Sequence, residues 1–310
     1  MALELPALWN KYVPEHLLPR LYGFELMMAP YAISHMKIGL KLYETGYTFG
    51  NEKRAHIYLT NSLEPSSDIT PEIEGLFGAL ADEAKLVNAI KREKRFTIIV
   101  GNPPYAGISS NMSDYAQRIV EDYKVVDGRP LNERKLWLQD DYVKFIRTGE
   151  VSITLANYGI LAYISNHGYL DNPTFRGMRQ NLMQTFQRIY ILDLHGNTNK
   201  KERAPNGDED KNVFDIRQGV AIGIFLRSKK IGTSSRIFRT DLSGLSGKKE
   251  QWLNQHELLS AEWNEITPLS PFYLFAYQSQ ENRTDYEKGW KITEIMPLTS
   301  TGFITARDHF

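Results

Sequence analysis

The stretch Asn102-Pro103-Pro104-Tyr105 combines residue types that can do chemistry. It follows the apolar run 96–101, which is typical of a buried parallel strand. The two prolines have no N–H for a sheet ladder and each fixes its own φ at roughly −65°, so the backbone is stiff. Open α/β sheets bind ligands where their strands end. An amide, a row of rigid carbonyls and an aromatic ring at such a place suit a flat, neutral group that carries an exocyclic NH2.

These groups can activate an aromatic amine. Such an amine is a poor nucleophile because its lone pair is delocalised into the ring. The side-chain oxygen of Asn102 and the carbonyl of Pro103 can accept both N–H hydrogens and turn the lone pair out of the ring plane, while Tyr105 stacks on the base. Preorganised acceptors also stabilise the positive charge that grows on the nitrogen as it attacks a methyl group. The alternative interpretation is a proline-rich turn in which Tyr105 only packs.

Two other polar residues end predicted strands. Residues 21–26 predict a short strand with Glu25 at its end, and residues 56–61 predict a strand that ends at Asn61. In nucleotide-binding folds, an acid at the end of the second strand accepts hydrogen bonds from ribose hydroxyls. The alternatives are an acid favoured by the dipole of the helix that Pro30 opens, and an ordinary turn asparagine.

Strands and helices alternate along most of the chain, which predicts a mostly parallel, doubly wound α/β sheet. Further helices are predicted to begin at Thr70 and Asp171, and the further strands are 96–101, 159–165, 188–194 and 219–226. Residues 251–310 lose this rhythm. We therefore expect a first domain over residues 1–240, followed over 241–310 by a linker and the beginning of a second domain.

Composition sets further bounds. The chain has 310 residues, 42% of them hydrophobic, which is enough for one sizeable core. The absence of cysteine excludes disulfides, thiolate metal sites and cysteine nucleophiles. No run is long enough to span a membrane and the N-terminus lacks a secretory signal, so we expect a soluble, cytoplasmic protein.

Charge is balanced overall, with 37 basic and 37 acidic residues, and gives no global signal of nucleic-acid binding. One local segment is basic, because residues 227–249 carry seven Lys or Arg and a single acid, Asp241. This segment is either a patch that contacts DNA phosphates or a solvated connector, and the sequence favours neither. The charged run 91–95 is interpreted as a solvated helix end.

The motifs together resemble those of the N6-adenine DNA methyltransferases, whose amino-methylating motif is Asn/Asp-Pro-Pro-Tyr/Phe. Their order along the chain resembles the methyltransferase part of large single-polypeptide restriction–modification enzymes. The runs that carry this resemblance are 23–33, 58–61, 102–105 and 212–222.

The resemblance implies a Rossmann-like fold and S-adenosylmethionine as methyl donor. Glu25 is then expected to bind the ribose of the cofactor and Asn61 its adenine amino group. Asn102, Pro103, Pro104 and Tyr105 are expected to act on N6 of an adenine that is flipped out of double-stranded DNA. No metal is required.

One departure qualifies this expectation. The family's first cofactor motif is a glycine-rich loop after the first strand, and residues 1–20 contain no glycine. We therefore expect a partial domain without its first strand and this loop, which binds S-adenosylmethionine weakly or not at all. The parent protein is expected to carry nuclease, motor and target-recognition domains in addition. Two alternatives stay open: a protein glutamine N-methyltransferase, which also uses Asn-Pro-Pro-Tyr, and a non-catalytic DNA-binding remnant.

Overall fold

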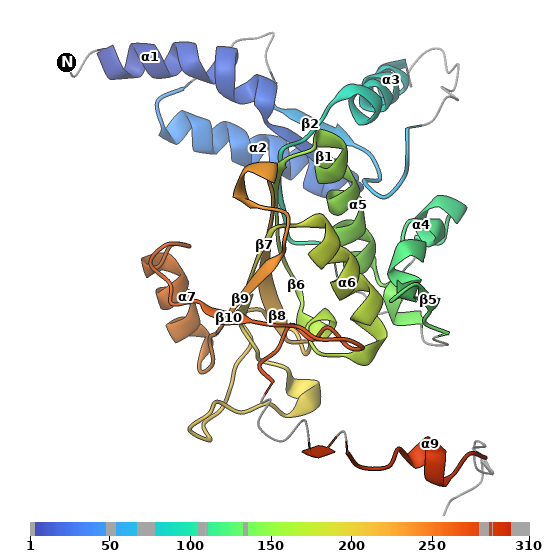
Figure 1. The fold of residues 1–310 in the computed structure, drawn as a ribbon. Coiled ribbons are helices and arrows are strands. Elements are labelled where there is room, and N and C mark those ends of the chain that lie inside the picture. The colour runs from blue at the N-terminus through green and yellow to red at the C-terminus, as the bar shows by residue number, and fades with distance from the viewer. Residues whose placement is uncertain are drawn as a thin grey trace, which may run out of the picture. The chain divides into compact units, whose positions relative to one another are not determined.

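The computed structural model of the chain consists of two compact units, Met1–Phe275 and Ala276–Phe310 (Figure 1). The residues that the structure describes are 4–47, 54–66, 78–104, 109, 111–132, 136–278, 285–286 and 288–298. The start of the helix predicted at Thr70 lies outside them. None of the described helices is both long and apolar enough to cross a membrane.

The N-terminal part of the first unit contains α1 (Glu4–Tyr12), β1 (Tyr22–Glu25), α2 (Met28–Glu44) and β2 (His56–Leu59). β1 and β2 are the two strands predicted before residue 62, and they pair in parallel. Buried apolar side chains of α2, β2 and the segment after α1 form their own small core. The members of this core that are least exposed are Val13, Leu18, Tyr47, Ala55 and Ile57.

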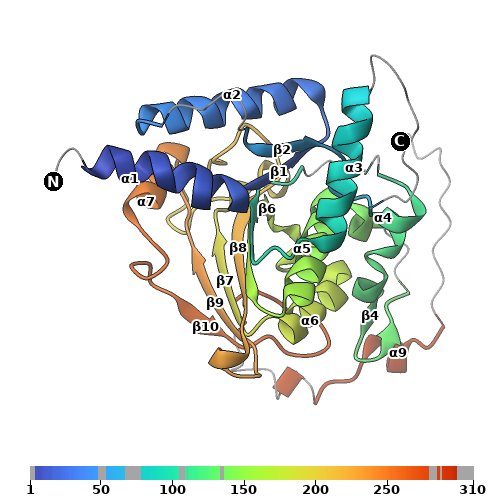
Figure 2. The same ribbon diagram turned by 90° about the horizontal axis from the view of Figure 1, so that it is seen from above.

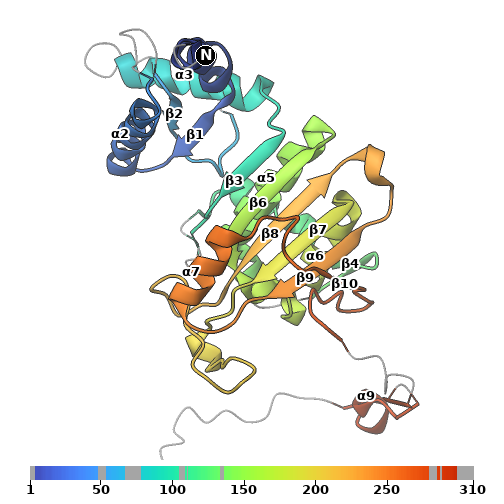
Figure 3. The ribbon, with the colours of Figure 1, turned by 90° about the vertical axis from the view of Figure 1, so that its left-hand side faces the viewer.

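A six-stranded sheet forms the centre of this unit, in the order β10-β9-β7-β8-β6-β3 (Figure 3). Its strands are β3 (Ile98–Gly101), β6 (Gly159–Asn166), β7 (Arg188–Asp193), β8 (Val220–Arg227), β9 (Arg236–Asp241) and β10 (Asn264–Ile266). β3 pairs in parallel with β6, and β7 with β9. Four strands therefore run the same way, as predicted for a mostly parallel sheet.

The sheet departs from the prediction at two strands. β8 is antiparallel to both of its neighbours, β6 and β7, and β10 is antiparallel to β9. A parallel connection needs a crossover, usually a helix. The segment between Asp193 and Val220 has no such helix, only a 3-10 turn at Thr198–Lys200, and so β8 returns beside β7 in the opposite direction. The strands β9 and β10 were not predicted.

Helices cover both faces of this sheet (Figures 2 and 3). On one face, α5 (Asp141–Ala156) and α6 (Arg176–Thr185) bury Val143, Ile146 and Leu182 in the main core. On the other face, α7 (Ser246–Gln255) packs its tryptophan and leucine against the ends of β7 and β8. This arrangement agrees with a doubly wound α/β fold.

The described strands form three sheets where one was expected: the six-stranded sheet, the pair of β1 and β2, and a short antiparallel pair of β4 (Val125–Val126) and β5 (Arg129–Pro130). Among these residues β1 pairs only with β2, and β3 pairs only with β6. The outward face of β3 is open, because Ile98 and Val100 are 67% and 75% exposed. α3 (Gly78–Glu93) connects the smaller sheet to β3.

The predicted domain boundary at residue 240 falls inside β9, which pairs with β7 and β10. The structural boundary follows Phe275, whose side chain is fully buried and whose N–H donates to the carbonyl of Leu170. The second unit contains the short helix α9 (Ile292–Ile295). Its role as the start of a target-recognition domain stays a prediction.

Candidate active site

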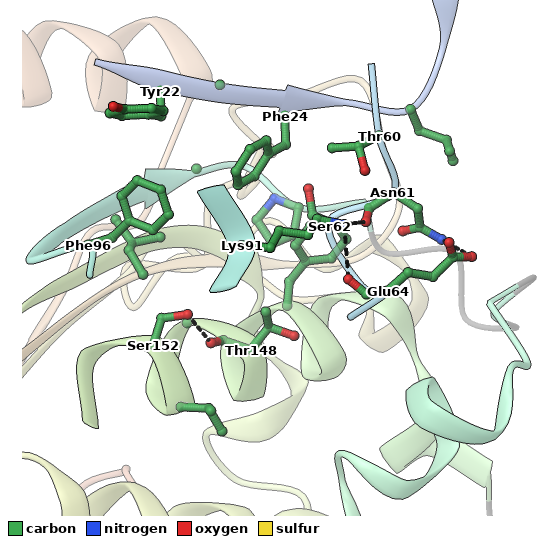
Figure 4. A pocket seen from close by; sticks show the side chains of 18 of the residues that line it. Tyr22, Phe24, Thr60, Asn61, Ser62, Glu64, Lys91, Phe96, Thr148 and Ser152 are labelled. Carbon is green, nitrogen blue, oxygen red and sulfur yellow. Dashed lines mark hydrogen bonds between the residues drawn. The ribbon is translucent and has the colours of Figure 1, made fainter. Parts of the chain in front are cut away.

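A cavity of about 890 Å3 lies where β1, β2 and β3 end. Glu25 ends β1, Asn61 follows β2 and Asn102 follows β3, and all three line this cavity. Figure 4 shows aromatic side chains at one end, including Phe24 and Phe96, and polar side chains around Asn61 at the other. The structure thus brings together three residues that are far apart in the sequence.

Glu25 is held by the backbone that follows it. Its Oε1 accepts hydrogen bonds from the N–H groups of Leu26 and Met27, at 2.9 and 3.0 Å. Oε2 accepts none from a described residue, and Glu25 is only half-buried at the cavity wall. The carboxylate is therefore both a helix-start acceptor and an acceptor that still faces the cavity.

The side chain of Asn61 makes three hydrogen bonds within the protein. Its Oδ1 accepts from the N–H of Leu63 at 3.0 Å, and its Nδ2 donates to Glu64 at 3.1 Å and to Asn111 at 2.9 Å. Both amide hydrogens are used within the protein, which leaves only the second lone pair of Oδ1 for a ligand. An incoming amino group can be accepted there without breaking a bond.

Asn102, Pro103 and Pro104 line the cavity directly after β3. Pro103 is buried, whereas Asn102 and Pro104 are exposed. Asn102 is thus an exposed residue that a rigid, buried one follows. Tyr105, the fourth residue of the motif, lies outside the described residues.

Lys91 is a site residue that the sequence interpretation missed. It was assigned to a solvated helix end, but its Nζ donates to the carbonyls of Asn61 at 2.8 Å and Glu64 at 3.0 Å. Burial lowers the pKa of Lys91, although the charge of Glu64 opposes this. The missed signal is its place on α3, one turn after the buried Val87, on the face that packs.

Comparison with known proteins identifies the family. A family model described as Eco57I restriction-modification methylase matches residues 20–199, which include β1, β2, β3 and the cavity residues. The chain belongs to this family. No match was found among curated protein sequences.

Solved structures share the fold of this methylase-family chain. A DrdV–DNA complex superposes with a TM-score of 0.70 at 23% identity, over 92% of this chain and 29% of that one. The ATP-dependent Type ISP restriction-modification enzyme LlaBIII, bound to DNA, gives 0.67 at 23% identity, over 85% and 18%. A nuclease-deletion mutant of the Type ISP enzyme LlaGI, with a DNA substrate mimic, gives 0.69 at 21% identity, over 89% and 23%.

The chain therefore spans between 18% and 29% of the length of these three enzymes. Together with the family match, these structures confirm the predicted resemblance to the methyltransferase part of large restriction–modification enzymes. They also confirm a mixed α/β fold for the chain.

The predicted phosphate-contact segment of this methylase-family chain is partly buried. Lys249 is fully buried, pairs with Asp210 and donates to the carbonyl of Leu194 at 2.6 Å. Arg239 is 6% exposed and pairs with two carboxylates. These two cations cannot contact DNA. The segment contains β9 and the start of α7, so it is not a simple connector. A phosphate contact by its other five cations stays a prediction.

A second polar cluster lies at the carboxyl ends of β6, β7 and β9. His167, Asp193 and His195 are close enough together to resemble a metal site. However, Nδ1 of His167 lies 3.0 Å from Asp193, its Nε2 lies 3.0 Å from the amide of Asn197, and Arg239 binds the second oxygen of Asp193 at 2.8 Å. Both ring nitrogens of His167 and both oxygens of Asp193 are therefore already hydrogen-bonded within the protein. The cluster is better described as an ion network than as a metal site.

Proposed function

We propose that this chain transfers a methyl group from S-adenosylmethionine to N6 of an adenine in double-stranded DNA, as the methyltransferase part of a restriction–modification enzyme. The observation that carries this proposal is the meeting of Glu25, Asn61 and Asn102 in one cavity. Each is a hydrogen-bonding residue at a strand end, where α/β folds bind nucleotides. Membership of the methylase family supports the same conclusion.

The cavity walls suit a nucleoside cofactor. Its volume of about 890 Å3 lies in the range of small-molecule sites. The free oxygen of Glu25 can accept from ribose hydroxyls, Oδ1 of Asn61 can accept from an adenine amino group, and Phe24 and Phe96 provide apolar surface for a base. S-adenosylmethionine, when bound, supplies an electrophilic methyl group.

The residues after β3 suit the acceptor. Asn102 is exposed at the rim, so a base that has left the duplex can reach it. Its side-chain oxygen and the carbonyl of the anchored Pro103 would hold the two amine hydrogens. This orients the nitrogen lone pair towards the methyl group and stabilises the charge that develops on nitrogen. The chain would thus raise the rate by aligning the nitrogen with the methyl group and by holding the amine with preorganised acceptors.

The test is to express the chain in a bacterial host that lacks adenine methyltransferases. Nucleoside mass spectrometry of the host DNA then shows whether N6-methyladenine accumulates. We also expect weak binding of S-adenosylmethionine in saturation-transfer NMR, because residues 1–20 provide no glycine-rich loop. Methyl groups found on cytosine, or on protein glutamine in place of DNA, would contradict the proposal.

A further inference from the structure

A buried lysine lies directly behind the polar wall of the cavity. Lys144, in the first turn of α5, has no exposed surface. Burying a lysine is costly unless its charge is fully hydrogen-bonded. Its Nζ donates to Oγ of Ser109 at 2.8 Å and to the carbonyl of Asn111 at 2.6 Å. Burial lowers the pKa of Lys144, and the charges of Asp141 and Asp140 oppose this effect.

Asp141, one turn away on the same helix, binds the same two residues. Its Oδ1 accepts from the hydroxyl of Ser109 at 2.5 Å and from Nδ2 of Asn111 at 3.2 Å. The Ser109 oxygen also accepts from the N–H of Asn111 at 3.0 Å. This hydroxyl therefore donates once and accepts twice, which uses its full hydrogen-bonding capacity. Asn111 is fixed through its backbone and its side chain at once.

Asn111 connects these residues to Asn61, which lies on another part of the cavity wall. Its Oδ1 accepts from Nδ2 of Asn61 at 2.9 Å, and Asn61, Asn111 and Asp141 all line the cavity. A continuous series of hydrogen bonds thus runs from α5, through Ser109 and Asn111, to Asn61 after β2. Lys144 does not itself line the cavity.

We propose that Lys144 is a positioning residue of the methyl-transfer site, which acts through Ser109 and Asn111 to fix the amide of Asn61. This inference rests on the proposed function. Without the ammonium, the Ser109 oxygen and the Asn111 carbonyl lose a buried donor, and these two residues must shift to find another. A displacement of about 1 Å between reacting groups can lower a rate about a hundredfold.

Lys144→Met tests this, because it removes the ammonium and keeps a long apolar side chain. Lys249→Met is a matched control. Lys249 is also fully buried and donates to two carbonyls, those of Leu194 and Lys211, at 2.6 and 2.8 Å. It lies on α7, however, and does not line the cavity. We expect Lys144→Met to lower kcat for methyl transfer at least tenfold at saturating S-adenosylmethionine. Lys249→Met should lower the melting temperature and leave kcat of the folded protein unchanged.

A second measurement does not depend on activity. In protein labelled with 15N asparagine, the side-chain amide signals of Asn61 and Asn111 should shift in Lys144→Met and not in Lys249→Met. Should Lys144→Met fail to fold, the milder Ser109→Ala takes its place in both measurements. Amide signals at their parental positions, or a parental kcat, would overturn the inference. If the unmodified chain transfers no methyl group, the proposed function fails, and the amide signals alone decide the positioning.

Discussion

Asn102 is the residue on which the proposed chemistry depends most. It is exposed, lines the cavity and is followed by the buried Pro103, which fixes the backbone next to it. Acceptors in such a setting act mainly on the transition state, in which positive charge develops on the amine.

Replacing Asn102 should therefore affect the rate and not the binding of DNA. We expect Asn102→Ala to lower the single-turnover methylation rate by roughly a hundredfold to a thousandfold, by analogy with the loss of one preorganised oxyanion-hole donor. DNA affinity should stay within about twofold, since phosphate contacts elsewhere supply most of it. Asn206→Ala, in an exposed loop, is the control. A parental methylation rate in Asn102→Ala would show that 102–105 is only a rigid turn.

Glu25 has two possible roles, which two substitutions separate. Glu25→Ala removes both the cavity-facing oxygen and the acceptor of the Leu26 and Met27 N–H groups, whereas Glu25→Gln keeps an acceptor for them. We expect Glu25→Ala to weaken S-adenosylmethionine binding by about 1.5–3 kcal/mol, the scale of a hydrogen bond to a charged group. Glu25→Gln should also weaken it. If titration NMR shows parental affinity for Glu25→Gln, the carboxylate serves only the start of α2.

At the scale of elements, an ion network joins the carboxyl ends of three strands. Asp193 ends β7 and accepts from His167 after β6 and from Arg239 on β9. Burial alone raises the pKa of Asp193, but the hydrogen bond from His167 and the neighbouring positive charges outweigh it and hold this pKa well below its usual range. The network thus fixes the relative positions of strands whose pairing partners come from distant parts of the chain.

His195 makes the stability of this network depend on pH. Burial lowers its pKa, but the hydrogen bond to Asp241 at 2.8 Å and the charges of Asp193, Asp241 and Glu202 raise it above the usual value. The stabilisation is therefore complete below about pH 6.5, the ordinary pKa of histidine, and is lost as the pH rises through the higher pKa of the folded protein.

Urea unfolding across this pH range measures the effect. From about pH 6.5 upwards, the free energy of unfolding should fall by up to about 1.4 kcal/mol per pH unit more steeply in the parent than in His195→Asn. Asparagine cannot titrate there and tolerates the left-handed backbone at this position, where φ is 51°. Equal slopes in the parent and His195→Asn would exclude His195 as the titrating group.

At the scale of the whole molecule, two buried arginines hold the last segment of the first unit, which ends at Phe275. Arg179 is fully buried and donates to the carbonyl of Phe272 at 2.6 Å and to that of Tyr273 at 2.9 Å. Arg239 donates to the carbonyl of Phe275 at 2.6 Å. Burial lowers the pKa of Arg179 to about 9, which indicates how strongly this cation depends on its acceptors.

Two truncations test whether this segment is needed for the stability of the first unit. A fragment 1–275 retains the acceptor carbonyls of Phe272, Tyr273 and Phe275 and should unfold with nearly the same midpoint as the full chain. A fragment 1–268 leaves both guanidinium groups short of acceptors, and should be less stable by at least about 3 kcal/mol. Urea unfolding followed by circular dichroism compares them. Equal stability of the two fragments would place the boundary earlier, nearer to the predicted residue 240.

The sequence by itself determined six of the strands and the place of the motif. The apolar runs that became β1, β2, β3, β6, β7 and β8 are local patterns, and a run of suitable length predicts a strand without knowledge of its neighbours. Pro103 and Pro104 after such a run fix where β3 ends, because their backbone restrictions are also local. Family resemblance then followed from the order of these motifs.

What lies against each element was decided only by the tertiary structure. Met36, Leu40 and Tyr43 recur at helical spacing and share one face of α2, but this face is exposed, at 58%, 53% and 68%. Periodicity shows which side chains share a face and not what covers that face. The burial of Lys144 was also decided by the fold. It depends on Ser109 and Asn111, which the fold brings to α5, because a charged side chain is buried only where such partners meet it.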